Sequence, residues 1–187
     1  MPNLPDKNTV TFCLSGLILL MLISFITTSV RAQNNNEAVT VDFLNVYNTT
    51  TGKTVQLADA FPDDTYNWRP AEEIRSVRES ILHIASGNYF FGTMLGISSP
   101  EGIDPRTLEQ SNMTKAEAIA ALKESVTYIN EGIKNISAED FETKIDFFGN
   151  EITKRQAMFI LGDHAAEHLG QLIAYARSNG VTPPWSR

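Results

Sequence analysis

The 187-residue chain contains 22 acidic and 15 basic side chains, which give a formal net charge of −7 at neutral pH. Lys and Arg form no cluster, and an acidic surface repels a phosphate backbone, so we expect no nucleic-acid partner. The single cysteine, Cys13, lies in an apolar N-terminal stretch. A chain that has lost this stretch therefore contains neither a disulfide nor a thiol nucleophile of its own.

The N-terminal segment has the pattern of a secretory signal. Residues 10–26 are almost wholly apolar and follow Lys7, while Val30 and Ala32 occupy the two positions that a signal peptidase recognises. We expect residues 1–32 to be a signal peptide cleaved after Ala32, which predicts a periplasmic or secreted protein. The alternative is a membrane anchor over residues 10–26, because a run of this length is at the lower limit for spanning a bilayer.

Residues 33–187 have a suitable length for one domain and contain four segments with helical patterns. The segment over residues 39–60 is the weakest, since it includes three consecutive threonines and Gly52, which are poor helix formers. The next helix begins with a capping box of Ser76 and Glu79 and extends to about Leu95.

A second capping box, Thr114 and Glu117, predicts a helix that ends near Lys134. Its buried face contains no polar residue of note, so we assign it a structural role. The last helix is expected over residues 153–179, where Gly180 provides a left-handed cap. Four helices joined by loops predict an all-α fold, an antiparallel four-helix bundle whose sites are built from inward-pointing side chains.

Two connections are expected to lack regular structure. Residues 96–112 contain two prolines and Gly102, which is typical of a long exposed loop. Residues 136–151 include Phe141, Phe147 and Phe148, which either cover one end of a pocket or close the core.

The three histidines of the chain are the candidates for a metal site. His164 and His168 are four residues apart, so both project from one face of the last helix, where Gln171 and Tyr175 continue the same polar stripe. His83 lies on the helix that begins at Ser76. Three neutral imidazoles with one open position suit a catalytic zinc ion, and nickel or iron accepts the same ligands. The alternative is that these histidines are exposed or hydrogen-bonded within the core.

Gly87 lies one turn after His83, on the same helical face. A glycine in the middle of a helix costs about 1 kcal/mol relative to alanine, so a reason for keeping it is expected. It either leaves room for a ligand or allows two helices to pack closely.

Two neighbours of the histidines are candidate catalytic residues. Glu167 lies about 60° around the helix from His164, where it could act as a base or orient an imidazole, or remain an exposed carboxylate. Gln171 could bind a substrate or bridge two helices. His164, Glu167 and His168 also match the signature of inverted zinc peptidases, but none of the 19 residues after His168 is a carboxylate that could be the required further ligand.

Several short motifs follow one another along the chain. They are Arg69-Pro70, Ser76 followed by His83, His164-x-x-x-His168-Leu169-Gly170-Gln171-Leu172, Tyr175-x-Arg177-x-x-Gly180, and Pro183-Pro184-Trp185-Ser186. In this order they resemble the DinB-like superfamily of four-helix metal proteins, and the resemblance covers nearly all of residues 33–187. It implies that His83, His164 and His168 bind one divalent ion, with zinc or nickel expected.

The resemblance also implies classes of activity. Some relatives transfer bacillithiol or mycothiol, one branch isomerises maleylpyruvate, and others are described as metal-dependent hydrolases. Most relatives are cytoplasmic, where small thiols are abundant, so the secretion signal departs from the thiol-dependent pattern. The hypotheses are therefore a hydrolase or thiol transferase with an unidentified small-molecule substrate, or a non-catalytic metal-binding bundle for storage, sensing or structure. Many relatives pair through helices, which makes a homodimer a further possibility.

Overall fold

The computed structural model describes residues 37–186. The predicted signal peptide, its cleavage position and the alternative anchor over residues 10–26 lie outside the described residues. Among the helices within residues 37–186, none combines the length and apolar character that a membrane crossing requires.

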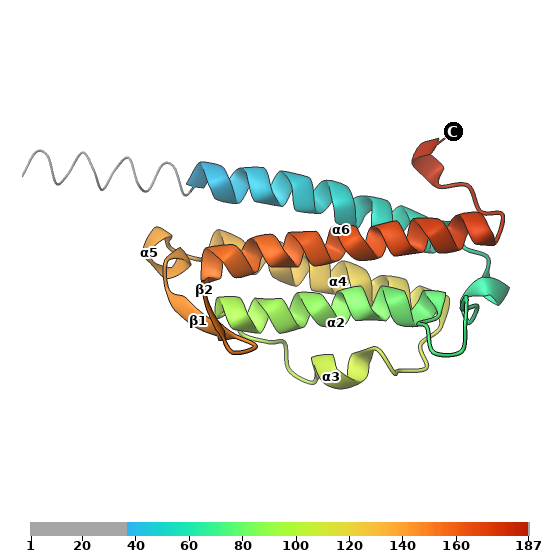
Figure 1. Ribbon diagram of the computed structural model, residues 1–187, viewed down its shortest axis with the longest axis horizontal. Helices are drawn as coiled ribbons and strands as arrows, with labels where there is room; N and C mark the ends of the chain where they lie inside the picture. Colours follow the sequence, from blue (N-terminus) through green and yellow to red (C-terminus); the bar gives the residue numbers. More distant parts are fainter. Residues whose placement is uncertain (1–36, 187) are drawn as a thin grey trace, which may run out of the picture. The chain divides into compact units, whose positions relative to one another are not determined.

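Four long helices form the bundle drawn in Figure 1, and the predicted all-α four-helix fold is thereby confirmed. They span residues 37–60, α2 (Val77–Leu95), α4 (Lys115–Lys134) and α6 (Lys154–Ser178). The first helix forms despite its threonines, because its apolar face packs into the core, where Tyr47 and Leu57 are almost completely buried. The hydroxyls of Thr51 and Thr54 are satisfied within the helix, since they donate to the carbonyls four residues earlier at 2.9 and 3.0 Å.

Side-chain caps define where the other three helices begin. The capping boxes predicted at Ser76 and Thr114 are both present, and Thr153 with Gln156 forms a third at the start of α6. Helix α2 ends at Gly96, whose φ of 89° places it in the left-handed region, and Gly180 beyond α6 has a φ of 71°. The boundaries of these helices therefore follow from local chemistry.

The helices do not simply alternate in direction. Helix α2 runs antiparallel to α6, and the first helix runs antiparallel to α4, where Asn48 and Asn130 exchange amide hydrogen bonds of 2.8 Å. Helices α2 and α4 run parallel, because Arg78 near the start of α2 bonds Asn112 just before α4, and Asn88 bonds Ser125 midway. The long connection between α2 and α4 returns the chain to the same end of the bundle (Figure 1).

Both connections contain regular structure that the sequence patterns did not reveal. The first holds α3 (Pro105–Leu108), whose Leu108 is buried beside α2. The second holds α5 (Ala138–Phe141) and a hairpin of β1 (Lys144–Phe147) and β2 (Asn150–Thr153). Strands of four residues are too short for a clear alternation of polar and apolar side chains, which explains the omission.

The core lies where the first helix, α2, α4 and α6 meet. One expectation about it is wrong, because the buried face of α4 includes a polar residue, the fully buried Ser125. Its hydroxyl accepts from the Asn88 amide nitrogen at 2.9 Å and donates to the Leu122 carbonyl at 2.8 Å, so the buried hydroxyl is fully hydrogen-bonded. The amide oxygen of Asn88 has no hydrogen-bond partner among the described residues. The large fully buried core residues include Leu57, Phe61, Val77, Ile81, Leu82, Ile84, Leu122 and Leu172.

Gly92 is predicted to allow the close contact between α2 and the Tyr128 ring of α4. A Cβ atom there would lie 2.3 Å from a ring carbon of Tyr128, whose hydroxyl is anchored by a bond to the Ile97 carbonyl. We expect Gly92→Ala to lower the free energy of unfolding by about 1–3 kcal/mol. Gly52→Ala is the matched control, since no atom lies within 4 Å of its Cβ position. The control should raise stability by about 1 kcal/mol. Urea unfolding measures both, and equal stability of Gly92→Ala and the parent would contradict the expectation.

Candidate metal centre

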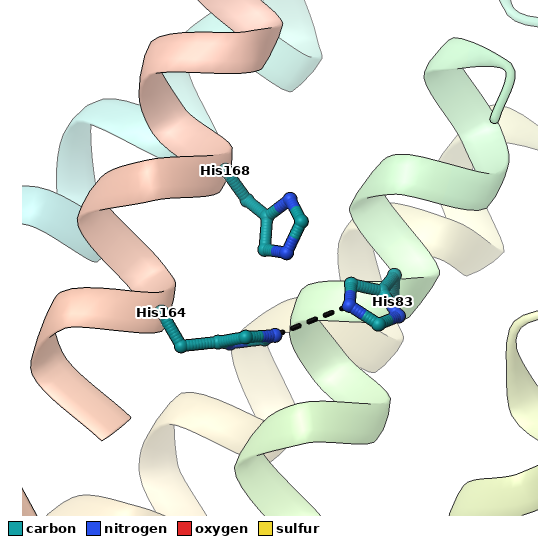
Figure 2. Close-up of side chains that lie close together, drawn as sticks. All are labelled: His83, His164 and His168. Carbon is teal, nitrogen blue, oxygen red and sulfur yellow. Dashed lines mark hydrogen bonds between the residues drawn. The ribbon is translucent and has the colours of Figure 1, made fainter. Parts of the chain in front are cut away.

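The structure brings the three histidines together between α2 and α6. One ring nitrogen from each of His83, His164 and His168 lies within 4.8 Å of the others. The Nε2 atoms of His83 and His164 are 3.2 Å apart, and Figure 2 shows a nitrogen of His168 directed toward the gap between the other two rings. All three side chains are partly buried. The cluster therefore combines residues 81 positions apart in the chain.

Gly87 makes this approach possible. A Cβ atom on Gly87 would lie 2.4 Å from Cε1 of His164 and 3.0 Å from its Nδ1. Of the two explanations that the sequence left open, close packing applies, but the group that requires the space is the imidazole of His164. The α2 backbone therefore forms one wall of the site.

His83 is oriented by a carboxylate that follows α3. Glu109 Oε2 lies 2.7 Å from Nδ1 of His83, and Arg75 donates to both oxygens of Glu109 at 2.6 and 3.3 Å. A carboxylate paired with arginine accepts hydrogen bonds, so Nδ1 of His83 carries the proton. The unprotonated Nε2 of His83 then faces the centre of the cluster.

His168 is oriented by a chain of hydrogen bonds that begins at the backbone of Arg75. The hydroxyl of Tyr175 donates to the Arg75 carbonyl at 3.1 Å and accepts from the Gln171 amide nitrogen at 2.8 Å. The amide oxygen of Gln171 must therefore face Nδ1 of His168, at 2.8 Å. Nδ1 donates this bond, so in the neutral imidazole the lone pair of His168 is on Nε2.

His164 differs from the other two ligand candidates. Its Nδ1 is buried and has no hydrogen-bond partner among the described residues. The ring is flanked instead by Phe91, with ring centroids 5.7 Å apart. Its orientation is therefore set by packing between Gly87 and Phe91 and by the 3.2 Å contact of its Nε2 with Nε2 of His83.

The surroundings keep the imidazoles of His83 and His164 neutral and the nearby carboxylate ionised. Burial, with the positive charges of its neighbours, lowers the pKa of His164 to about 3. Burial also lowers the pKa of His83, and this outweighs the opposing bond to Glu109. Burial opposes ionisation of Glu109, but its bonds to Arg75 and His83 outweigh this and lower its pKa. The nitrogen lone pairs of His83 and His164 are therefore available near neutral pH.

The donor set fits a divalent metal ion. Two nitrogens bound tetrahedrally to one zinc ion at about 2.0–2.1 Å lie about 3.3–3.4 Å from each other. The separation of 3.2 Å between the His83 and His164 nitrogens agrees with this geometry. Hydrogen bonds from the outer imidazole nitrogens to a carboxylate and an amide oxygen are also typical of metal-binding histidines.

The other predicted site residues occupy different surroundings. Gln171 contacts His168 and Tyr175, so its amide holds a histidine in place. Glu167 is exposed and bonds none of the three histidines, and its role as a base stays a prediction.

Sequence analysis missed Glu109 and Arg75, which complete the site. Both lie outside the long helices, in segments without a periodic pattern, and neither belongs to a motif that would single it out. The histidine pair at positions 164 and 168 gave a spacing signal, whereas these two residues meet only through the fold.

A sequence model of the DinB superfamily matches residues 47–172, which include all three histidines. The chain belongs to the DinB superfamily. An uncharacterised Bacillus subtilis protein, YjoA, is 24% identical over 132 residues, which are 69% of this chain and 83% of YjoA.

Solved structures of DinB-like proteins share the fold. A DinB-like protein from Bacillus cereus has a TM-score of 0.66 and 19% identity, with 76% of this chain and 93% of that chain covered. YfiT from Bacillus subtilis has a TM-score of 0.61 and 15% identity, with 76% of this chain and 89% of that chain covered. YfiT is described as a probable metal-dependent hydrolase with an unusual four-helix bundle topology.

Gly87→Ala is predicted to disrupt the metal centre. The new methyl group would lie 2.4 Å from the His164 ring, which has to move away from His83. We expect zinc affinity to fall at least about tenfold, the scale of losses caused by misplaced ligands. Competition with a chromophoric chelator measures the affinity. Gly52→Ala, which meets no atom within 4 Å, should bind zinc like the parent. Unchanged affinity of Gly87→Ala would show that the site does not depend on this contact.

Glu109→Gln is predicted to weaken zinc binding about 10- to 100-fold, although the side chain keeps its size. The amide cannot satisfy both neighbours, because an oxygen turned toward His83 leaves its NH₂ group facing the guanidinium of Arg75. Glu101→Gln in the same connection is the control, since Glu101 is exposed. Equal losses in the two variants would attribute the effect to overall charge, and no loss in either would remove Glu109 from the site.

Proposed function

We propose that this DinB-superfamily protein is a metal-dependent hydrolase in which His83, His164 and His168 hold a divalent ion, with zinc or nickel expected. The observation that carries the proposal is the convergence of three imidazole nitrogens, two of them with their protons held on the outer side by Glu109 and Gln171. The description of YfiT as a probable metal-dependent hydrolase supports it.

Three protein ligands leave a coordination position for water or substrate. When bound, a divalent ion supplies Lewis acidity and makes a coordinated water more acidic than bulk water. The chain's own residues hold the ligands in position: Glu109 with Arg75 orients His83, and Gln171 with Tyr175 orients His168. Because Gln171 is engaged on both sides of its amide, we assign it this positioning role ahead of direct contact with substrate.

A non-catalytic metal-binding protein is the second candidate, and one observation favours it. The carboxylate nearest the cluster, Glu109, is already bonded to Arg75 and His83, while Glu167 is exposed. Neither is free and directed at the centre as a general base would be. Glu167 remains the candidate base in the hydrolase proposal, since a bound substrate can reach an exposed carboxylate.

We further propose that the protein acts in the periplasm or outside the cell after loss of residues 1–32. This location favours hydrolysis over transfer of a cytoplasmic thiol. N-terminal sequencing of the protein purified from a bacterial host distinguishes cleavage after Ala32 from retention of an anchor over residues 10–26.

The decisive experiment is elemental analysis and metal titration of residues 33–187. The parent is expected to retain a single equivalent of zinc or nickel, and both His83→Ala and His164→Ala/His168→Ala to lose it. The metal-loaded parent is then assayed on ester, amide and thiol-acceptor substrates. Glu167→Gln should bind metal like the parent and lose turnover if Glu167 is the base.

Each outcome separates the proposals. Metal binding without hydrolysis of any substrate would favour the non-catalytic protein. Equal metal contents in the parent and the histidine variants would disprove the three-histidine site. Turnover in all variants would show that the activity arises elsewhere.

A further inference from the structure

Phe148 lies in an unfavourable backbone conformation at the tip of the hairpin. Its φ of 52° makes it the one non-glycine residue with positive φ among residues 37–186. Phe148 and Gly149 form a two-residue turn of the type that normally uses Asn-Gly, because both central residues need positive φ. The side chain is also 78% exposed. A bulky aromatic residue that is both strained and exposed requires an explanation other than folding.

The exposed ring belongs to a series of aromatic rings. Phe148 lies edge-on to Phe147 with centroids 4.8 Å apart, and its ring is nearly parallel to that of Phe90 at 6.0 Å. Phe90, on α2, is itself 37% exposed. The hairpin tip and α2 therefore present adjacent aromatic surfaces to solvent.

The series continues inward to the metal centre. Phe147 is nearly parallel to Phe91 at 6.1 Å, and Phe91 lies 5.7 Å from the imidazole of His164. Phe91 is only 6% exposed, so the series leads from solvent to the buried side of a metal-ligand candidate. We call these four residues, Phe90, Phe91, Phe147 and Phe148, the aromatic strip.

We propose that the aromatic strip binds a long alkyl or aryl group of the substrate while the reacting group lies at the three histidines. This inference rests on the proposed metal centre. The continuity of the rings with His164 favours a small molecule that reaches both places, and Phe148 places an apolar ring at a turn position whose positive φ suits asparagine or glycine better.

The test uses hydroxamates, whose head group binds zinc and whose chain length can be varied. Acetohydroxamate and decanohydroxamate are titrated calorimetrically into the zinc-loaded protein. Each methylene that lies on an apolar surface adds affinity, so the longer compound should bind the parent at least about tenfold more tightly.

Phe148→Asn separates binding from folding. Asparagine suits the turn, so the variant should melt at a higher temperature than the parent. It should nevertheless bind decanohydroxamate about 3- to 10-fold more weakly and acetohydroxamate equally well. Phe159→Asn is the control, because Phe159 is also exposed, at 53%, but its ring contacts Phe43 and not the strip. This control should leave both affinities unchanged.

Nuclear Overhauser effects between the alkyl chain and the rings of Phe91 and Phe148, collected with and without zinc, report on the strip independently of the metal. If zinc does not bind but the alkyl chain still contacts these rings, the proposed function is wrong and the aromatic strip is confirmed as a binding surface. Equal affinities for the two hydroxamates, or alkyl contacts with other residues, would disprove the proposal that the aromatic strip binds the substrate. A change of sedimentation in Phe148→Asn without a change of affinity would instead identify an interface between copies of the chain.

Discussion

The contact between the backbone of Gly87 and the imidazole of His164 sets how closely α2 and α6 approach, and the cluster of three histidines depends on that distance. His83 and His164 place their Nε2 atoms 3.2 Å apart because no side chain stands between α2 and the ring. Packed helices usually lie about 8–10 Å apart, and glycine at position 87 leaves the space in which the His164 ring contacts the α2 backbone. Glycine within a helix lowers stability, and here it allows histidines from two helices to meet.

Helix capping and ligand orientation are linked through Arg75. This residue immediately precedes Ser76, the N-cap of α2, so the capping box that starts the helix also determines where Arg75 lies. From that position its guanidinium binds Glu109, which orients His83, and its carbonyl accepts the bond from Tyr175, which leads through Gln171 to His168. The orientations of His83 and His168 thus both depend on Arg75, the residue before the N-cap of α2. The capping box of α2, which the sequence reveals, therefore helps to position side chains from three separate segments.

Local chemistry explains which features were predictable. The spacing of His164 and His168 and the capping boxes at Ser76 and Thr114 involve residues within one helical turn, so sequence reveals them directly. Glu109 joins the site across 26 positions from His83, and Ser125 pairs with Asn88 across 37, and no pattern within either segment indicates such a partner. The parallel direction of α2 and α4 was not predicted for the same reason. It depends on the path of a connection whose small helix α3 docks through one buried residue, Leu108.

Three departures from favourable local structure are connected by direct side-chain contacts. Gly87 interrupts the interior of α2, His164 keeps a buried nitrogen without a hydrogen-bond partner among the described residues, and Phe148 adopts a positive φ. Gly87 and Phe91 both contact His164, and Phe91 connects through Phe147 to Phe148. Folding alone would favour alanine, a hydrogen-bonded or apolar side chain, and asparagine at these positions. Departures of this kind concentrate at functional sites, where the stability they forgo is recovered elsewhere in the fold. Their contiguity therefore argues that the histidine cluster and the exposed hairpin tip belong to a single site.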